Sequence, residues 1–254
     1  MTPRMKIEII TLFPEYFDSV ISQSIIGKGR EKKLFEIEIV NLRDFAEDRH
    51  KTADDKPFGG GGGMVLKVEP LYKCLKSLSY ESKPAEDERI VLTSAAGKTL
   101  TQDMAVECSL LRRLTIICGH YLGVDERLLS LFEIDEVSIG DFILTGGEPA
   151  AAVMIDSVVR LIPGVLGNFE SALSDSHTER ILGTPVYTRP EEFEGISVPD
   201  ELIGGNHAEI EKFRRNQALK KTFENRPELL KNVELDSSER KYIDDLRKKK
   251  NGNK

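Results

Sequence analysis

The stretch that decides the fold is VSIGDFILTGGEPAA, residues Val137–Ala151. Its first half alternates apolar residues with small polar ones, which is typical of a buried strand, and we predict a strand over Val137–Leu144. The strand ends near two glycines, Gly146 and Gly147, as a phosphate-binding loop would. No lysine follows them, however, and the GxGxxG, GKS and GKT patterns are missing. This strand end therefore lacks the usual signature of phosphate binding.

Outward from this stretch, apolar runs rich in β-branched residues alternate with segments of helical spacing. The other predicted strands are Lys6–Phe13, Phe35–Leu42, Arg89–Ser94 and Leu114–Gly119. The predicted helices are Glu15–Lys28, Glu69–Ser79, Thr101–Leu111, Val124–Phe132 and Pro149–Leu161, the last with an inner stripe of Ala150, Val153, Met154, Ser157 and Val158. Such alternation predicts an α/β fold with a largely parallel sheet. Ligands of these sheets bind at the carboxyl ends of the strands, here the loops after Ser94, Gly119 and Leu144.

Composition indicates a soluble globular protein with a reducing location. Of 254 residues, 39% are hydrophobic and 31% charged, and no segment has the length of a signal peptide core or of a membrane helix. Three cysteines, far apart in apolar stretches, favour buried thiols over a disulfide framework. We therefore expect a cytoplasmic protein without a membrane partner.

The net charge of -7 argues against a nucleic-acid partner, but its distribution does not. Between Lys212 and Lys231, seven basic residues stand against two acidic ones, and RKKKNGNK closes the chain. The last fifth of the chain could therefore hold a polyanion, although the terminal run also fits a solvated chain end.

Three regions are expected. Residues 1–162 form the α/β domain, residues 163–188 form a linker without periodicity and rich in glycine and proline, and residues 189–254 form a basic helical domain. Asn206, three residues before Glu209, resembles a capping box at a helix start.

Several groups of residues could carry chemistry or could be purely structural. The glycines Gly59–Gly63 would allow a flat ligand close to the backbone, or form a plain flexible loop. Asp175, between two serines, fits a turn as well as a catalytic acid, and Arg160 by itself fits an ordinary surface position. The four histidines have no zinc spacing, so we expect no metal cage.

Eight motifs in order resemble the bacterial tRNA (guanine-N1)-methyltransferases, the TrmD family. They are LFPEYF, PFGGGGGM, CGHYLGVDER, EVSIGDFILTGGEPAA, LIPGVLGN, SDSHTE, VYTRPEEFEG and GNHAEIEKFR. The resemblance covers about Met5 to Lys231, and each motif alone is weak whereas eight in register are very specific. It implies the SPOUT class, in which the α/β domain contains a deep trefoil knot, an exception to the rule that chains do not thread loops.

The resemblance also implies a site for S-adenosylmethionine in three loops. Backbone groups of Ile139, Gly140, Phe142 and Leu144 would pair with the adenine, while Gly146 and Gly147 let the chain pass close to it. A neutral or cationic ligand without phosphate would explain the missing lysine. The implied cofactor-binding residues are Ser94, Gly119, Tyr121, Gly123, Ser138, Ile139, Gly140, Asp141, Phe142, Ile143, Leu144, Gly146 and Gly147.

By the same resemblance, Asp175 is the general base that removes the proton of guanine N1 as the methyl group arrives. Arg160 would stabilise the charge that develops toward O6 of the base. The site would form between two subunits of a homodimer, and the substrate would be guanine at position 37 of tRNA. Lys212, Arg214 and Arg215 would grip the anticodon stem.

The chain departs from the family pattern at four positions. Leu122 stands where many relatives have glutamate, which leaves a magnesium dependence open, and Ala95, His177 and Phe213 replace a frequent proline, phenylalanine and tryptophan. None of these is the base or its arginine, so activity is expected to survive.

Two alternatives stay open: an α/β enzyme that binds another nucleotide, such as NAD, and an RNA-binding protein without catalysis. The first would need a glycine loop after the first strand, where Pro14 and Glu15 stand instead.

Overall fold

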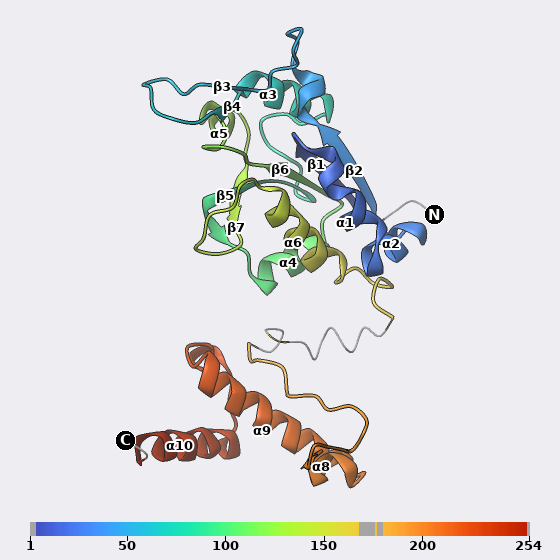
Figure 1. The fold of residues 1–254 in the computed structure, drawn as a ribbon, viewed down its shortest axis with the longest axis vertical. Helices are drawn as coiled ribbons and strands as arrows, with labels where there is room; N and C mark the ends of the chain where they lie inside the picture. The colour runs from blue at the N-terminus through green and yellow to red at the C-terminus, as the bar shows by residue number, and fades with distance from the viewer. Residues whose placement is uncertain (1–3, 168–175, 177–179, 253–254) are drawn as a thin grey trace. The chain divides into compact units, whose positions relative to one another are not determined.

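The chain forms two compact units, Met1–Phe169 and Glu170–Lys254. The computed structural model describes residues 4–167, 176 and 180–252. The first unit contains a five-stranded sheet with helices around it (Figure 1). The second unit is mainly helical within its described residues.

All neighbouring strands of the five-stranded sheet run parallel. In spatial order they are β2 (Glu36–Asn41), β1 (Lys6–Thr11), β6 (Arg113–Cys118), β5 (Glu88–Thr99) and β7 (Asp135–Ser138). The α/β class with a parallel sheet is therefore confirmed. Since parallel strands end at the same edge, the loops that follow β5, β6 and β7 lie together.

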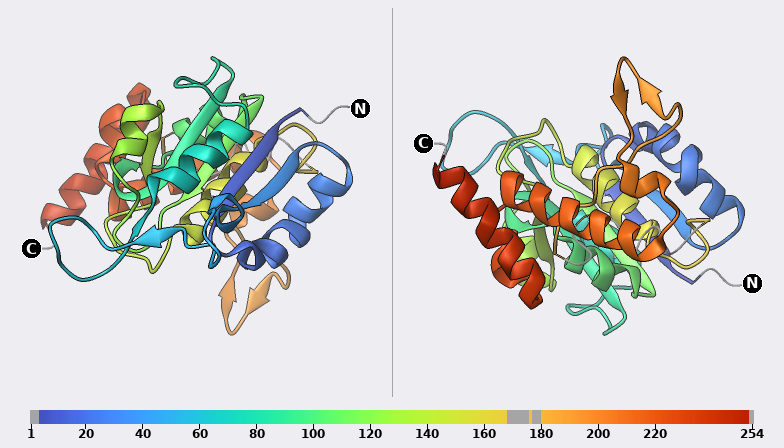
Figure 2. Two further views of the ribbon diagram at one scale, coloured as in Figure 1. Left: turned by 90° about the horizontal axis from the view of Figure 1, so that it is seen from above. Right: turned by 90° about the horizontal axis from the view of Figure 1, so that it is seen from below.

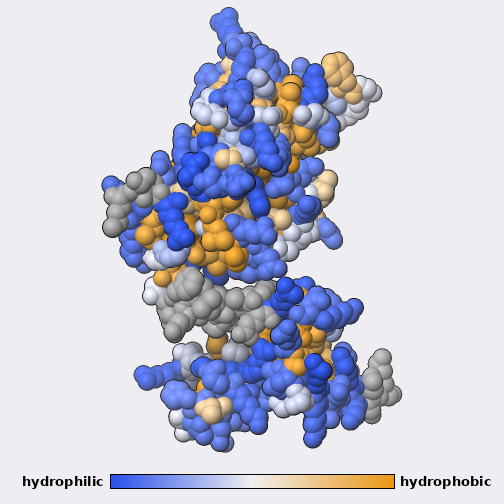
Figure 3. Space-filling view, turned by 180° about the vertical axis from the view of Figure 1, so that it is seen from behind, coloured by the Kyte–Doolittle hydropathy of each residue, from blue (hydrophilic) through white to orange (hydrophobic). Residues whose placement is uncertain are grey.

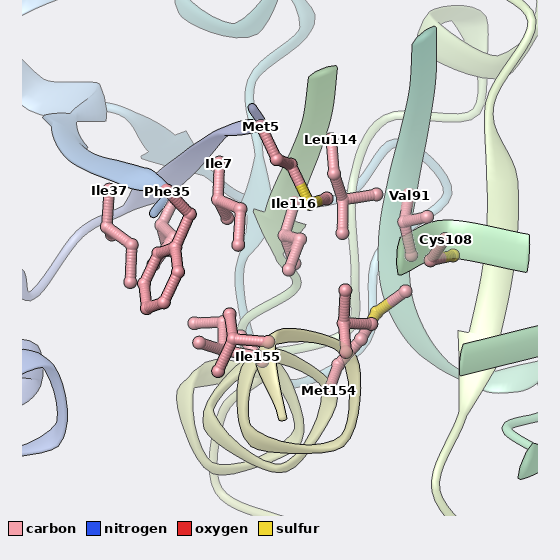
Figure 4. Close-up of a cluster of buried hydrophobic side chains, with 14 of the residues drawn as sticks. Met5, Ile7, Phe35, Ile37, Val91, Cys108, Leu114, Ile116, Met154 and Ile155 are labelled. Atoms are coloured by element: carbon pink, nitrogen blue, oxygen red, sulfur yellow. The ribbon is translucent and has the colours of Figure 1, made fainter. Parts of the chain in front are cut away.

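Alternation along β1 supplies apolar side chains to both faces of the sheet, and a hydrophobic core lies on each face. Ile7 and Ile9 enter one core, which contains Met154 and Ile155 of α6, as Figure 4 shows, whereas Ile10 enters the other. Helices of the first face are α1 (Asp18–Ser22), α2 (Ser24–Glu31), α4 (Gln102–Ser109) and α6 (Glu148–Val159), with the 3-10 turn η1 (Pro14–Phe17). Those of the second face are η2 (Leu42–Phe45), α3 (Val68–Ser77) and α5 (Arg127–Leu131).

The predicted strand over Val137–Leu144 was wrong from Ile139 onward, because β7 spans Asp135–Ser138. The Ser138 hydroxyl accepts a hydrogen bond from Gly140 N and donates one to Gly140 O, which turns the chain out of the sheet. Gly140 has a φ of +147°, a conformation that side chains rarely adopt. The residues that follow form a loop of mostly exposed side chains, so their strand-like alternation is not used in a sheet.

Two helix predictions also need correction. The helix expected over Glu15–Lys28 is three short segments, broken at Ser24, whose φ is +56°. The helix α6 buries Ala150, Met154 and Val158 as expected, but Val153 is 47% exposed.

A buried ion pair ties β1 to β6. Glu8, on β1, is fully buried and accepts hydrogen bonds from Arg113 Nε and Nη2 at 2.9 and 2.8 Å and from Thr115 Oγ1 at 2.7 Å. Arg113 lies over the ring of Tyr80 and also donates to Leu78 O at 2.6 Å. Burial acts to raise the pKa of Glu8, but the hydrogen bonds from Arg113, Thr115 and Lys6 outweigh it and leave that pKa below its ordinary value.

We predict that Glu8→Gln lowers the free energy of unfolding by about 3 kcal/mol, because Arg113 keeps a buried charge without its partner. Because the pKa of Glu8 is lowered in the folded state, the carboxylate contributes its full stabilisation above pH 4.5, the ordinary pKa of a glutamate side chain. This contribution is lost as the pH falls through the lower pKa of the folded state. Urea titrations between pH 3 and pH 7 should therefore show less acid sensitivity in the variant. The control is Glu38→Gln, at an exposed partner of Lys6, with an expected effect within about 1 kcal/mol. Equal losses in both variants would contradict the prediction.

The second unit has its own small core, formed by Ile181, Ala218, Leu219 and Ile243. Asn206 caps its longest helix by accepting a hydrogen bond from Ala208 N at 3.2 Å, so the predicted helix start is confirmed. Its elements are β8 (Glu192–Phe193), β9 (Ile196–Ser197), α8 (Asp200–Ile203), α9 (His207–Asn225), η3 (Leu229–Asn232) and α10 (Ser237–Gly252). Figure 2 shows β8 and β9 as a short hairpin. Across the described residues, the helices are too short or too polar to cross a membrane.

Candidate active site

Hydrogen bonds join the loops that follow β6 and β7 to each other and to β5. The loop expected directly after Ser94 was wrong in position, because β5 continues through Ser94 to Thr99. Thr93, near the middle of β5, accepts at its Oγ1 a hydrogen bond from Gly119 N at 3.0 Å and donates to Ile117 O at 3.2 Å. Gly119 O in turn accepts from Gly147 N at 2.6 Å. Thr93 of β5 therefore holds the loop after β6 (the second loop) in place, and that loop in turn holds the loop after β7 (the third loop).

Gly147 is packed so closely that no side chain fits there. A Cβ at this position would lie 2.0 Å from Thr93 Oγ1 and 2.7 Å from Gly119 N. Both contacts are far below van der Waals distance, and Gly119 N belongs to the backbone. Gly147 therefore allows the close approach of one loop to another. The close approach to an adenine that was expected for the two glycines stays a prediction.

The loop from Ser138 to Gly147 presents apolar side chains and backbone to its surroundings. Phe142 and Ile143 are 53% and 82% exposed. Both polar backbone groups of Gly140 are already bonded within the loop, since its N–H donates to Ser138 Oγ and its carbonyl accepts from Phe142 N. Of the four residues expected to pair with an adenine, Ile139 and Leu144 are therefore better suited than Gly140.

The glycine-rich segment Gly59–Gly63 is joined to the second loop at its base. It lies between two short antiparallel strands, β3 (Asp54–Asp55) and β4 (Val65–Leu66). Leu122 N donates to Met64 O at 3.0 Å, and a Cβ on Gly63 would lie 3.1 Å from the Leu122 side chain. The residues at positions 59–62 have open space where their Cβ atoms would be, which leaves room for a ligand or another chain.

Of the two predicted catalytic residues, the structure places one. Arg160 directly follows α6 as its C-cap, at the end of the helix opposite to Gly147. Asp175 lies outside the described residues. The structure therefore leaves their mutual geometry as a prediction.

The predicted RNA-binding residues lie together on the first half of α9. Lys212 is exposed, and Arg214 is exposed with an ion pair to Glu211 at 3.1 Å. Arg215 differs, because its Nε lies 2.6 Å from Glu239 Oε1, on the last helix, and its side chain is partly buried. Arg215 therefore helps to join α9 to α10.

Cys118, at the end of β6, is nearly fully buried beside the three loops. Burial, together with the charge of Glu148, raises the pKa of the Cys118 thiol well above its ordinary value, so it stays neutral. Within the described part of the chain, no three histidine, cysteine or acidic side chains are grouped so that they could hold a metal ion.

Comparison with known proteins shows the same family across most of the chain. Residues 5–232 match the family model described as tRNA (Guanine-1)-methyltransferase TrmD. The chain belongs to this family. Three similar proteins, each named tRNA (guanine-N(1)-)-methyltransferase, are those of Geotalea uraniireducens, Brevibacillus brevis and Geobacter sulfurreducens, with 49%, 48% and 50% identity. The alignments cover 96%, 97% and 93% of this chain and 98%, 100% and 95% of those proteins.

Two residues whose hydroxyl groups hold the loops in place were missed in the sequence. Thr93 and Thr11 were counted only as strand residues, although a hydroxyl in a buried strand needs a hydrogen-bond partner. Both are buried, and both bond to a loop or to the helix that follows one. A polar residue within an apolar run was the available signal.

Proposed function

We propose that this member of the TrmD family transfers a methyl group from S-adenosylmethionine to N1 of guanine at position 37 of tRNA. The observation that carries the proposal is the set of hydrogen bonds that joins Thr93, Gly119 and Gly147 and so holds two loops against β5. These loops offer backbone groups and apolar side chains. Between Val137 and Ala151 there is no lysine or arginine. A ligand without phosphate fits such a site, and a pyrophosphate does not.

The proposed donor site uses all three loops. Its residues are those implied by the family resemblance: Ser94, Gly119, Tyr121, Gly123, Ser138, Ile139, Gly140, Asp141, Phe142, Ile143, Leu144, Gly146 and Gly147. Exposed apolar side chains such as Phe142 and Leu144 suit the flat face of an adenine. Threading of these loops as a trefoil knot is part of the proposal.

When bound, S-adenosylmethionine supplies a methyl group on a positively charged sulfur. The Asp175 carboxylate takes the proton from guanine N1, which forms its bond to the methyl carbon as the bond from that carbon to sulfur breaks. The Arg160 guanidinium stabilises the negative charge that moves toward O6 of the base. In this scheme Asp175 of one subunit serves the donor held by the other subunit.

A homodimer and a cytoplasmic location complete the proposal. Val153 on α6 is 47% exposed and Ile143 on the loop after β7 is 82% exposed, which provides apolar surface for a second copy. Figure 3 shows one mainly hydrophilic face with apolar residues gathered in patches. Sedimentation equilibrium tests the dimer, and magnesium dependence is tested by assays with and without EDTA.

The decisive experiment incubates the purified protein with methyl-labelled S-adenosylmethionine and tRNA transcripts that carry G or A at position 37. We expect label in the G37 transcript alone. Label in neither transcript, with donor binding intact, would support a binding protein without catalysis. Failure to bind S-adenosylmethionine, combined with binding of NAD, would support the nucleotide-binding alternative.

For the RNA-binding residues we predict different effects at neighbouring arginines. Arg214→Ala weakens tRNA binding and lowers the salt slope of the affinity by about one, with the melting temperature unchanged, because it removes a phosphate contact. Arg215→Ala also lowers the melting temperature, because the ion pair with Glu239 joins α9 to α10. Fluorescence anisotropy across a salt series and circular dichroism melting measure both effects.

The matched control for Arg215 is Glu239→Gln, which weakens the same ion pair without removing a positive charge. It should lower the melting temperature but leave the salt slope as in the wild type. If Arg214→Ala destabilises the fold as much as Arg215→Ala does, the division of roles is wrong.

A further inference from the structure

Residues from three segments that are distant in the sequence form a buried polar cluster beside Gly146 and Gly147. Thr11, at the end of β1, donates from Oγ1 to Glu148 Oε1 at 2.7 Å. Glu148 is the first residue of α6 and is 97% buried, where the positive end of the helix dipole stabilises a carboxylate. The third member, His120, comes from the loop after β6. The cluster therefore connects the sheet, the helix and the loops of the proposed donor site.

His120 has a buried polar atom, Nδ1, that lies slightly too far from the nearest carboxylate oxygen for a hydrogen bond. Its Nδ1 has no hydrogen bond within the part of the chain that the structure describes, and it lies 3.7 Å from Glu148 Oε2. The rings of Phe13 and Tyr121 flank the imidazole, with centroids 5.1 and 4.4 Å away. Because a buried nitrogen without a partner is costly, a shift of less than 1 Å toward the carboxylate would be favourable.

The double glycine covers this gap. A Cβ on Gly146 would lie 2.4 Å from His120 Nδ1 and 2.5 Å from Glu148 Oε2, so the Gly146 backbone rests directly on both side chains. Gly146 also pairs with His120 in an isolated β-bridge. The distance between the imidazole and the carboxylate is therefore linked to the position of the turn at Gly146–Gly147.

The other titratable groups around the imidazole do not compete for Glu148 as charged groups. Cys118 is neutral because burial, and then the charge of Glu148, raises its pKa. Tyr121 packs edge-on against His120, with its side chain about half exposed. Glu148 Oε2, at 3.7 Å, is thus the acceptor that His120 Nδ1 faces.

We propose that His120 and Glu148 are positioning residues which close into an Nδ1–H to Oε2 hydrogen bond when the methyl donor binds, and so hold the Gly146–Gly147 turn against it. The inference rests on the proposed donor site. In this arrangement Thr11 fixes the carboxylate, the carboxylate orients the imidazole, and the imidazole supports the turn. The pair acts on donor binding and not on the chemical step.

Two amide variants test the pair, because each places an amide nitrogen near the position of one of the two ring nitrogens of His120. The His120→Asn amide reaches the position of Nδ1, whereas the His120→Gln amide reaches that of Nε2. We expect His120→Gln to raise the KM for S-adenosylmethionine about tenfold, the effect of about 1.4 kcal/mol, with kcat within about twofold of the wild type. His120→Asn should restore the KM to within about twofold of the wild type, and calorimetry with the donor alone should give the same order.

A spectroscopic measurement follows the hydrogen bond in the unaltered protein. The chain has four histidines, so the His120 signals in protein labelled with nitrogen-15 histidine are assigned by their loss in one variant. Adding S-adenosylmethionine should shift the Nδ1 resonance of His120 toward that of a protonated, donating nitrogen. A contribution limited to stability would lower the melting temperature without this shift.

The outcomes separate the pair from the proposed function. If the wild type binds no S-adenosylmethionine, both the function and the pair are overturned. If the wild type binds and transfers methyl groups but Asn and Gln at position 120 behave alike, or the Nδ1 resonance does not respond to the donor, only the pair is overturned. Loss of kcat with an unchanged KM would likewise overturn it.

Discussion

Replacing Gly147 by alanine is expected to abolish binding of the methyl donor and to destabilise the first unit. The new Cβ would lie 2.0 Å from Thr93 Oγ1 and 2.7 Å from Gly119 N. To relieve these contacts, the third loop must move away from the second, and the hydrogen bond from Gly147 N to Gly119 O is lost with that movement. Overpacking in a site of this kind costs about 1–3 kcal/mol in stability, and the loss of loop geometry adds to the effect on binding.

Calorimetric titration with S-adenosylmethionine and thermal unfolding measure the two effects of Gly147→Ala. We expect no detectable binding and a lower melting temperature. The matched control is Gly167→Ala, because a Cβ at Gly167 meets nothing within 4 Å and this residue needs no unusual φ. Donor binding by Gly147→Ala with an affinity near that of the wild type would show that the loop contacts do not define the site.

A second variant separates crowding from loss of the loop contact. Thr93→Ala removes the hydroxyl that Gly147→Ala would strike, but also the acceptor for Gly119 N. The double variant should therefore recover part of the stability of Gly147→Ala without recovering donor binding. Full recovery of binding would mean that the Thr93 hydroxyl only limits space.

The class of the fold was predictable because parallel strands buried on both faces leave a simple pattern. Ile7, Ile9 and Ile10 are all buried, and the run that they form in the sequence indicates a central strand. The strand that was overextended, Val137–Leu144, shows the limit of such patterns. Phe142 and Ile143 continue the apolar run but lie exposed in a loop, because the local hydrogen bonds of Ser138 end the strand first.

The site could be predicted only where its residues are special in themselves. Gly147, whose close packing the structure shows, stood out in the sequence because two adjacent glycines follow an apolar run. The pair of His120 and Glu148 was not, since the two side chains are 28 positions apart and meet only through the crossing of loops. Histidine spacing was used to exclude a metal site, and it contains no information about a single acidic partner. Residues that only the fold brings together can be identified only from the structure.

Removing the carboxylate of Asp175 is expected to have the largest effect on catalysis. Guanine N1 carries a proton at neutral pH, and its lone pair becomes available to the methyl carbon only as that proton leaves. A positioned general base contributes about 10²–10⁴-fold to such a step, so Asp175→Ala should lower kcat by a factor in this range. Donor affinity should stay near that of the wild type, because none of the three loops of the proposed donor site contains residue 175.

The measurement is single-turnover methyl transfer to the G37 transcript at saturating donor, with calorimetry of donor binding beside it. Asp175→Asn is the matched variant, because it keeps the size of the side chain but cannot accept the proton at neutral pH. Both variants should lose transfer to a similar extent, whereas Arg160→Ala should lose it by about 10²–10³-fold without a change in donor affinity. If Asp175→Asn retains wild-type transfer, the proton of N1 leaves by another route, and the assignment of Asp175 as the base is wrong.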